Sequence, residues 1–135
     1  MLRKTRRKQR EKVLEFLYRM EIGNEPAEEL VSELKSEADA GKSAPFTFEL
    51  FSRTCRNLEK IDGLLSKYSK NWNLERVGMI DRNIMRMAVC EMLEFVDIPV
   101  AVTIDEAIEL SKKYSTPSAA KFVNGVLDRI KTEVK

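Results

Sequence analysis

The sequence predicts an all-α protein with six or seven helices and no sheet. Apolar residues recur at helical spacing along almost the whole chain. Several of these apolar runs are preceded by residues typical of helix starts. The one β-like stretch, DIPVAV at 97–102, is a single short segment with no second strand to pair with.

The first half of the chain predicts three helices. Apolar residues at 13, 16, 17 and 20 form one face of a first helix, which ends at Gly23 and Asn24. Pro26 suits the first turn of a second helix, which ends near residues 40–41. Thr47 is a candidate cap for a third helix that continues to Tyr68, with an interruption or kink at residue 63. The length of the chain predicts a single domain over residues 1–135. Within it, the linker at 39–46, between the second and third predicted helices, is the expected boundary between two sub-bundles.

The second half of the chain predicts a short irregular turn of helix at 71–78 and then three more helices. Residues 79–95 carry one apolar face. TIDE at 103–106 fits a capping box, in which Thr103 and Glu106 begin the next helix. Thr116 and Pro117 suit the cap and first position of the last helix. Gly125 lies inside that helix at a cost of ~1 kcal/mol relative to Ala, so we expect a neighbouring helix or a ligand to approach it closely.

Composition excludes several functional classes. The chain has 135 residues, of which 43% are hydrophobic and 34% charged, and it has two cysteines and no histidine. Two separate thiols favour a reducing cytoplasm, and the absence of histidine removes the commonest general base and zinc ligand. We find no nucleotide-binding or hydrolase motif, no membrane-length apolar run and no signal sequence. We therefore expect no enzyme activity, no cofactor, no metal and no membrane segment.

Charge is concentrated at the N-terminus. Seven of the first twelve residues are Lys or Arg and one is Glu, which gives this segment a formal charge of +6. Because the whole chain carries +2, the other 123 residues carry −4. A basic end on a mildly acidic body predicts a polyanionic partner.

Helical geometry sharpens that prediction. At about 100° per residue, the arginines at 3, 6, 7 and 10 fall within an arc of about 100° and form a stripe. Leu14 and Tyr18 continue the stripe along the same helix. Anion binding is the favoured interpretation, and a solvated tail or a membrane-surface helix remain alternatives.

Longer motifs resemble the NusB family of bacterial transcription antitermination factors. They are RRKQRE and FLY at the start, LERVGMIDRNIMRMAVCEML at 74–93, DIPVAVTIDEAIELSKKYS at 97–115 and KFVNGVLD at 121–128. The resemblance covers nearly the whole chain. It implies an all-α fold of about seven helices in two packed sub-bundles.

The resemblance also implies function and partners. Family members bind the single-stranded boxA signal in RNA and pair with NusE, a small-subunit ribosomal protein. The complex joins NusA, NusG and RNA polymerase and favours terminator read-through, notably in ribosomal RNA operons. The family includes monomers and homodimers, so both states stay open for this chain.

The candidate site residues come from two sources: the positions of this sequence that match the family motifs, and the basic stripe at the N-terminus. The candidate RNA-binding residues are Arg3, Lys4, Arg6, Arg7, Lys8, Arg10, Ser118, Lys121, Phe122 and Asn124. The candidate NusE-binding residues are Leu14, Tyr18, Glu75, Arg76 and Asp81. Phe122 has two interpretations, because its helical spacing also fits the core.

Two other functions remain as alternatives. One is a stand-alone version of the NusB-like module found at the front of certain ribosomal RNA methyltransferases. The other is a helical adaptor that binds only protein and whose basic end is a solvated tail.

Overall fold

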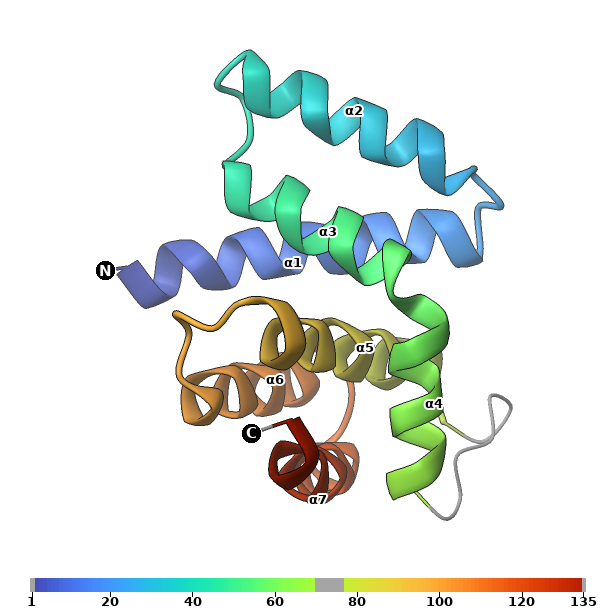
Figure 1. Ribbon diagram of the computed structural model, residues 1–135, viewed down its shortest axis with the longest axis vertical. Coiled ribbons are helices and arrows are strands. Elements are labelled where there is room, and N and C mark those ends of the chain that lie inside the picture. The colour runs from blue at the N-terminus through green and yellow to red at the C-terminus, as the bar shows by residue number, and fades with distance from the viewer. Residues whose placement is uncertain (1, 70–76, 135) are drawn as a thin grey trace. The chain divides into compact units, whose positions relative to one another are not determined.

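A computed structural model describes residues 2–69 and 77–134, with the side chains of residues 2–4 excepted. In these ranges the chain forms seven α-helices and no strand (Figure 1). The helices are α1 (Leu2–Glu21), α2 (Ala27–Asp39), α3 (Pro45–Arg56), α4 (Leu58–Tyr68), α5 (Met79–Glu94), α6 (Val100–Tyr114) and α7 (Pro117–Val134). The all-α prediction is therefore confirmed.

The chain divides into two compact helical units. Unit 1 spans Met1–Arg56 and holds α1 to α3, and unit 2 spans Asn57–Lys135 and holds α4 to α7. The units divide between α3 and α4, whereas the predicted boundary at 39–46 is the connection between α2 and α3 inside unit 1.

In unit 1, α3 packs against both α1 and α2. Three of the four residues of the predicted apolar face of α1 are buried, with Val13, Phe16 and Leu17 at most 1% exposed, and Met20 is half-buried. Phe16 meets Phe51 of α3 edge-on, with ring centroids 5.8 Å apart and an interplanar angle of 70°. This T-shaped pair is a favoured aromatic geometry and fixes the two helices against each other.

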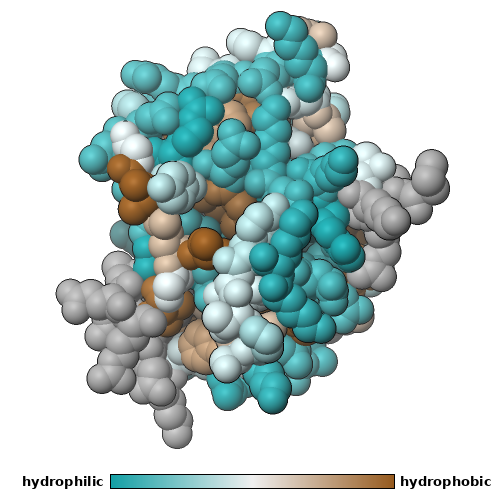
Figure 2. Space-filling model, turned by 180° about the vertical axis from the view of Figure 1, so that it is seen from behind, coloured by the Kyte–Doolittle hydropathy of each residue, from teal (hydrophilic) through white to brown (hydrophobic). Residues whose placement is uncertain are grey.

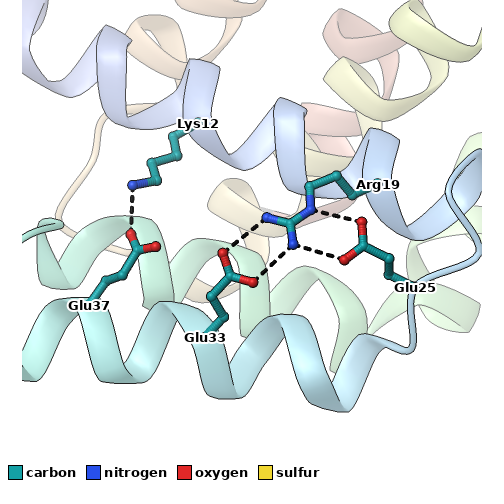
Figure 3. A network of polar contacts seen from close by, with 5 residues as sticks. All are labelled: Lys12, Arg19, Glu25, Glu33 and Glu37. Carbon is teal, nitrogen blue, oxygen red and sulfur yellow. Dashed lines mark hydrogen bonds and ion pairs between the residues drawn. The ribbon is translucent and has the colours of Figure 1, made fainter.

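A polar network joins α1 to α2 and the turn between them (Figure 3). The Arg19 guanidinium donates to both carboxylate oxygens of Glu25, at 2.9 and 2.8 Å, and to both of Glu33, at 3.1 and 2.9 Å. These bonds hold the pKa of Glu25 below its ordinary value. Lys12 donates to Glu37 at 2.7 Å, and that bond together with one from Ser43 lowers the pKa of Glu37. Both carboxylates are therefore charged at neutral pH, and the network joins α1 to α2 at Glu33 and Glu37.

Unit 2 is built around α5. Every residue of α5 from Asp81 to Met92 is buried, including five polar or charged side chains. A helix buried on all sides must pair its charges internally. Arg86 does so with Asp62 of α4 through two bonds of 2.8 and 2.9 Å, and also donates to Asn83 at 3.1 Å. This pair holds α4 against α5.

We predict that Asp62→Ala lowers the free energy of unfolding by about 2 kcal/mol, because it removes two charge-assisted hydrogen bonds from the nearly buried Arg86 guanidinium. The side chain of Asp62 is 32% exposed, which keeps the loss below that of a fully buried pair. Urea unfolding measures the change. The control is Asp128→Ala, which removes a carboxylate that is 59% exposed and paired with Lys131. This control is expected to change stability by under about 1 kcal/mol. Equal losses in the two variants would contradict the prediction.

Two helix starts lie earlier than their capping signals predict. The predicted capping box at Thr103 is wrong, because α6 begins at Val100 and the backbone carbonyl of Pro99 accepts from the N–H groups of residues 102 and 103. Thr103 is 2% exposed and donates its hydroxyl to Glu91 of α5 at 2.9 Å. The predicted cap at Thr47 is also wrong, since α3 begins at Pro45. Both threonines lie inside helices, and packing buries them.

The predicted long third helix is two helices. The break falls at Asn57 between α3 and α4, and Gly63 lies inside α4. The last helix starts as predicted: α7 begins at Pro117, and the Thr116 hydroxyl accepts from the backbone N–H of Ala119 at 3.0 Å.

Hydrophilic side chains cover most of the face in Figure 2, and apolar groups form small patches among them. None of the helices in the described ranges is long and apolar enough to cross a membrane.

Candidate nucleic-acid interface

The N-terminal part of α1 presents arginine beside an aromatic ring of α3. The Arg6 guanidinium carbon lies 4.1 Å from the centroid of the Phe46 ring, a cation–π contact. Arg6 and Arg7 are half-buried and Lys8 is exposed. A guanidinium that stacks through its face keeps its N–H groups directed outward in its plane, where they suit phosphate oxygens. Arg3 and Lys4 belong to α1, and their side chains lie outside the described residues.

Arg10 does not belong to the exposed stripe. It is only 2% exposed, and its guanidinium carbon lies 5.6 Å from the Phe46 ring centroid. Helical spacing places Arg10 on the same side of α1 as Arg6, but spacing alone does not predict which residues of other helices cover that side. Burial removes Arg10 from direct contact with RNA and makes it a structural cation.

A groove follows the basic side of α1 within unit 1. It has a volume of about 430 Å³ and is lined by Thr5, Lys8, Gln9, Lys12, Lys42, Ser43, Ala44 and Thr47. Three of the eight lining residues are lysines, and Lys42 comes from the connection between α2 and α3. The sequence prediction missed Lys42, because only the packing of that connection against α1 brings it beside Lys8.

A second groove lies in unit 2, between the end of α4 and one side of α7. Its volume is about 540 Å³, and its lining residues are Lys67, Tyr68, Ser69, Lys121, Phe122, Gly125 and Arg129. Phe122 is half-buried and forms part of the wall. The groove therefore combines three cations with two aromatic rings, which are the groups that bind phosphates and stack on bases.

The other predicted α7 residues lie beside this groove. Ser118, Lys121 and Asn124 are exposed, and Lys121 lines the groove. Gly125 has no closely packed neighbour in the described part of the chain. A Cβ built on it would meet only the Arg129 guanidinium, at 3.8 Å. Of the two close approaches expected at Gly125, by a neighbouring helix or by a ligand, the described residues do not show the first, and the missing side chain leaves the groove open.

Sequence reasoning also missed the α4 residues of this groove. The sequence predicts Tyr68 as the end of a long third helix, whereas in the structure it is half-buried and its hydroxyl donates to Glu133 of α7. Arg129 donates to the backbone carbonyl of Tyr68 at 3.0 Å, which holds the end of α4 against α7. The two segments are 61 residues apart in sequence. No local pattern predicts such a pairing.

The candidate partner-binding residues fall into three groups. On α1, Tyr18 is 51% exposed and Leu14 is half-buried, and Ile22, the first residue after α1, is 53% exposed. These three positions are four residues apart and follow one side of the helix. Glu75 and Arg76 lie outside the described residues.

Asp81 has a different environment from the one a partner contact requires. It is 7% exposed, and its two carboxylate oxygens accept from the hydroxyls of Ser111 of α6 and of Ser115, the residue after α6, at 2.7 and 2.8 Å. It also lies in the first turn of α5, where the helix dipole stabilises a negative charge. These contacts make Asp81 a link between α5 and α6 rather than an exposed acid.

Comparison with known proteins gives a consistent relationship. Residues 7–132 match the model of the NusB family. The transcription antitermination protein NusB of Dictyoglomus turgidum is 43% identical over 131 residues, which cover 94% of this chain and 84% of that protein. A structure of T. maritima NusB superposes with a TM-score of 0.79 at 39% identity, covering 95% of this chain and 91% of that one.

A structure of the antitermination factors NusB and NusE in complex with double-stranded RNA also matches. It has a TM-score of 0.75 and 28% identity, and the match covers 96% of this chain and 98% of that one. Sequence and fold thus agree over nearly the full length, and the chain belongs to the NusB family.

Proposed function

We propose that this chain is a non-enzymatic RNA-binding transcription antitermination factor. It binds boxA-type single-stranded RNA together with NusE and acts in the cytoplasm, with NusA, NusG and RNA polymerase, to favour terminator read-through in ribosomal RNA operons. The observation that carries the RNA part is the unit 2 groove, where Phe122 and Tyr68 lie among Lys67, Lys121 and Arg129. Among relatives, the NusB structure with NusE and RNA supports the partner assignment.

Each unit supplies a different part of RNA recognition. In unit 1, Arg6, Arg7 and Lys8 at the start of α1 supply positive charge for phosphates. In unit 2, aromatic side chains supply flat surfaces on which unpaired bases stack. Stacking of this kind requires splayed-out bases, which is why we propose single-stranded RNA as the ligand although the related complex holds a duplex.

The direct test measures binding of a fluorescent boxA-like RNA by anisotropy, with and without NusE, over a salt series. We expect modest affinity for this chain alone and tighter binding with NusE, because two protein surfaces then share one RNA. The controls are a scrambled single strand of equal length and the boxA duplex. Absence of RNA binding under all conditions, with NusE still bound, would favour the protein-only adaptor. Sedimentation of the free protein separates monomer from homodimer.

The exposed side of α1 gives a prediction for NusE. Tyr18→Ala is expected to weaken NusE binding by about ten-fold, because exposed tyrosines that become buried on binding contribute strongly to protein interfaces. Titration calorimetry measures the affinity, and the far-UV helix signal is expected to stay unchanged since Tyr18 is 51% exposed. The control is Val96→Ala, which trims a side chain that is 89% exposed in the connection between α5 and α6. Unchanged affinity in Tyr18→Ala would remove this side of α1 from the interface.

A further inference from the structure

In the unit 2 groove, a lysine ammonium group and a tyrosine hydroxyl already bind a carboxylate of this chain. Glu133, near the end of α7, accepts a hydrogen bond from the Tyr68 hydroxyl. Its two carboxylate oxygens lie 3.5 and 3.4 Å from the Lys67 ammonium nitrogen. Lys67 and Tyr68 both line the groove, whereas Glu133 is outside the set of lining residues. One internal anion therefore binds two groups on the groove wall.

The chemistry of these contacts matches that of a phosphate contact. A phosphodiester oxygen accepts hydrogen bonds from an ammonium group and from a hydroxyl group, as a carboxylate oxygen does. The Tyr68 hydroxyl and then Lys67 lower the pKa of Glu133, so its carboxylate is charged at neutral pH. The same contacts raise the pKa of Lys67 and of Tyr68, which keeps both of them protonated donors.

We propose that Glu133 competes with RNA phosphate for Lys67 and Tyr68, so that RNA enters this groove fully only when the Glu133 carboxylate is displaced. The inference rests on the proposed RNA-binding function and adds a regulating residue to that site. The exchange is easy, because Lys67 is 61% exposed and Glu133 37% exposed, and exposed ion pairs are weak. Lys121, which is exposed in the same groove, supplies a further cation for the incoming strand.

The competition lowers RNA affinity without blocking binding. A single phosphate gains little by replacing Glu133 at Lys67, because one anion is exchanged for another. An RNA whose bases also stack on the Phe122 wall gains additional contacts that the carboxylate does not offer. Stacking therefore offsets the cost of displacing Glu133, and that cost is the same for any RNA whose phosphate contacts Lys67.

The test compares Glu133→Gln with the wild-type chain in the anisotropy assay, using the boxA-like single strand. Glutamine keeps the length and an acceptor oxygen but removes the charge. We expect affinity to rise about two- to five-fold. We also expect the slope of log affinity against log salt to steepen by about 0.7, because one more phosphate then contacts a cation that no internal anion holds.

The matched control is Asp128→Asn, which removes one negative charge from the same helix. Asp128 pairs with Lys131 at 2.8 Å and does not line the groove. A second comparison places Glu133→Gln in a Lys67→Ala background, where its gain is expected to shrink to that of Asp128→Asn. Equal affinities and slopes for Glu133→Gln and Asp128→Asn would overturn this inference alone. Failure of the wild-type chain to bind RNA would overturn the proposed function and this inference together.

Discussion

Replacing Arg6 and Arg7 together with alanine is expected to weaken RNA binding by about thirty-fold at low salt. Each lost arginine removes about 1 kcal/mol of charge-assisted contact with phosphate, and the two losses multiply in affinity. The slope of log affinity against log salt is expected to become shallower by about 1.4, since each single-strand phosphate contact contributes about 0.7. Anisotropy titrations between low and physiological salt measure both quantities.

Burial and ring contacts in unit 1 are the reason that we expect the largest effect at Arg6 and Arg7 rather than at Arg10. Arg10 is 2% exposed, so the end of the stripe nearest the core is unavailable to a ligand. Arg6 stacks on Phe46 and is thereby held in place on α1 before RNA arrives. A cation that is already ordered loses less side-chain entropy when it binds phosphate. We therefore expect Arg6 to contribute more than a lysine on a disordered tail.

The control removes two cations elsewhere in unit 1. Lys35 pairs with Asp39 at 3.2 Å, and Arg53 pairs with Glu49 at 3.0 Å. Lys35→Ala with Arg53→Ala changes net charge by the same amount and is expected to leave affinity within about two-fold. Equal effects of the two double variants would show that net charge, rather than the start of α1, attracts the RNA.

Local sequence patterns predicted most helices because the signals and their effects lie within a few residues of each other. Thr116 caps α7 through a bond to the N–H of Ala119, only three residues later. The same kind of signal failed at Thr103, because the β-like residues before it join α6 and the hydroxyl turns to Glu91 instead. A capping motif indicates that a side chain can accept a hydrogen bond from the first turn of a helix. Tertiary packing decides whether that bond forms or whether the helix starts earlier and buries the same side chain.

The candidate site was predictable only where one helix carries it. The positions on α1 and on α7 follow from spacing and from the family motifs, and the exposure of Tyr18, Lys121 and Asn124 agrees with those assignments. Lys67 and Tyr68 join the groove only because α4 packs beside α7, a pairing that no local pattern encodes. The burial of Asp81 could not be predicted from local sequence either, because its serine partners lie 30 and 34 residues away.

Phe122 allows the groove itself to be tested, because its helical spacing is compatible with either the core or a ligand. We expect Phe122→Ala to weaken RNA binding by about ten-fold, within the range that stacking on a single base supports. The side chain is half-buried, so we expect an accompanying loss of about 1–2 kcal/mol in the free energy of unfolding, less than for a core phenylalanine. Anisotropy and urea unfolding measure the two effects on the same preparation.

Val123 is the matched control, because it is adjacent on α7 and 0% exposed. Val123→Ala is expected to destabilise unit 2 by about 1–2 kcal/mol while leaving the RNA affinity of the folded protein unchanged. Phe122→Leu separates the two roles further, since leucine keeps an apolar side chain in the wall but has no ring on which a base stacks. A core role predicts that Phe122→Leu restores wild-type RNA binding and that Phe122→Ala behaves like Val123→Ala. A stacking role predicts that Phe122→Leu regains stability and stays weak in RNA binding, because the groove then keeps its shape and its cations but has lost the Phe122 ring.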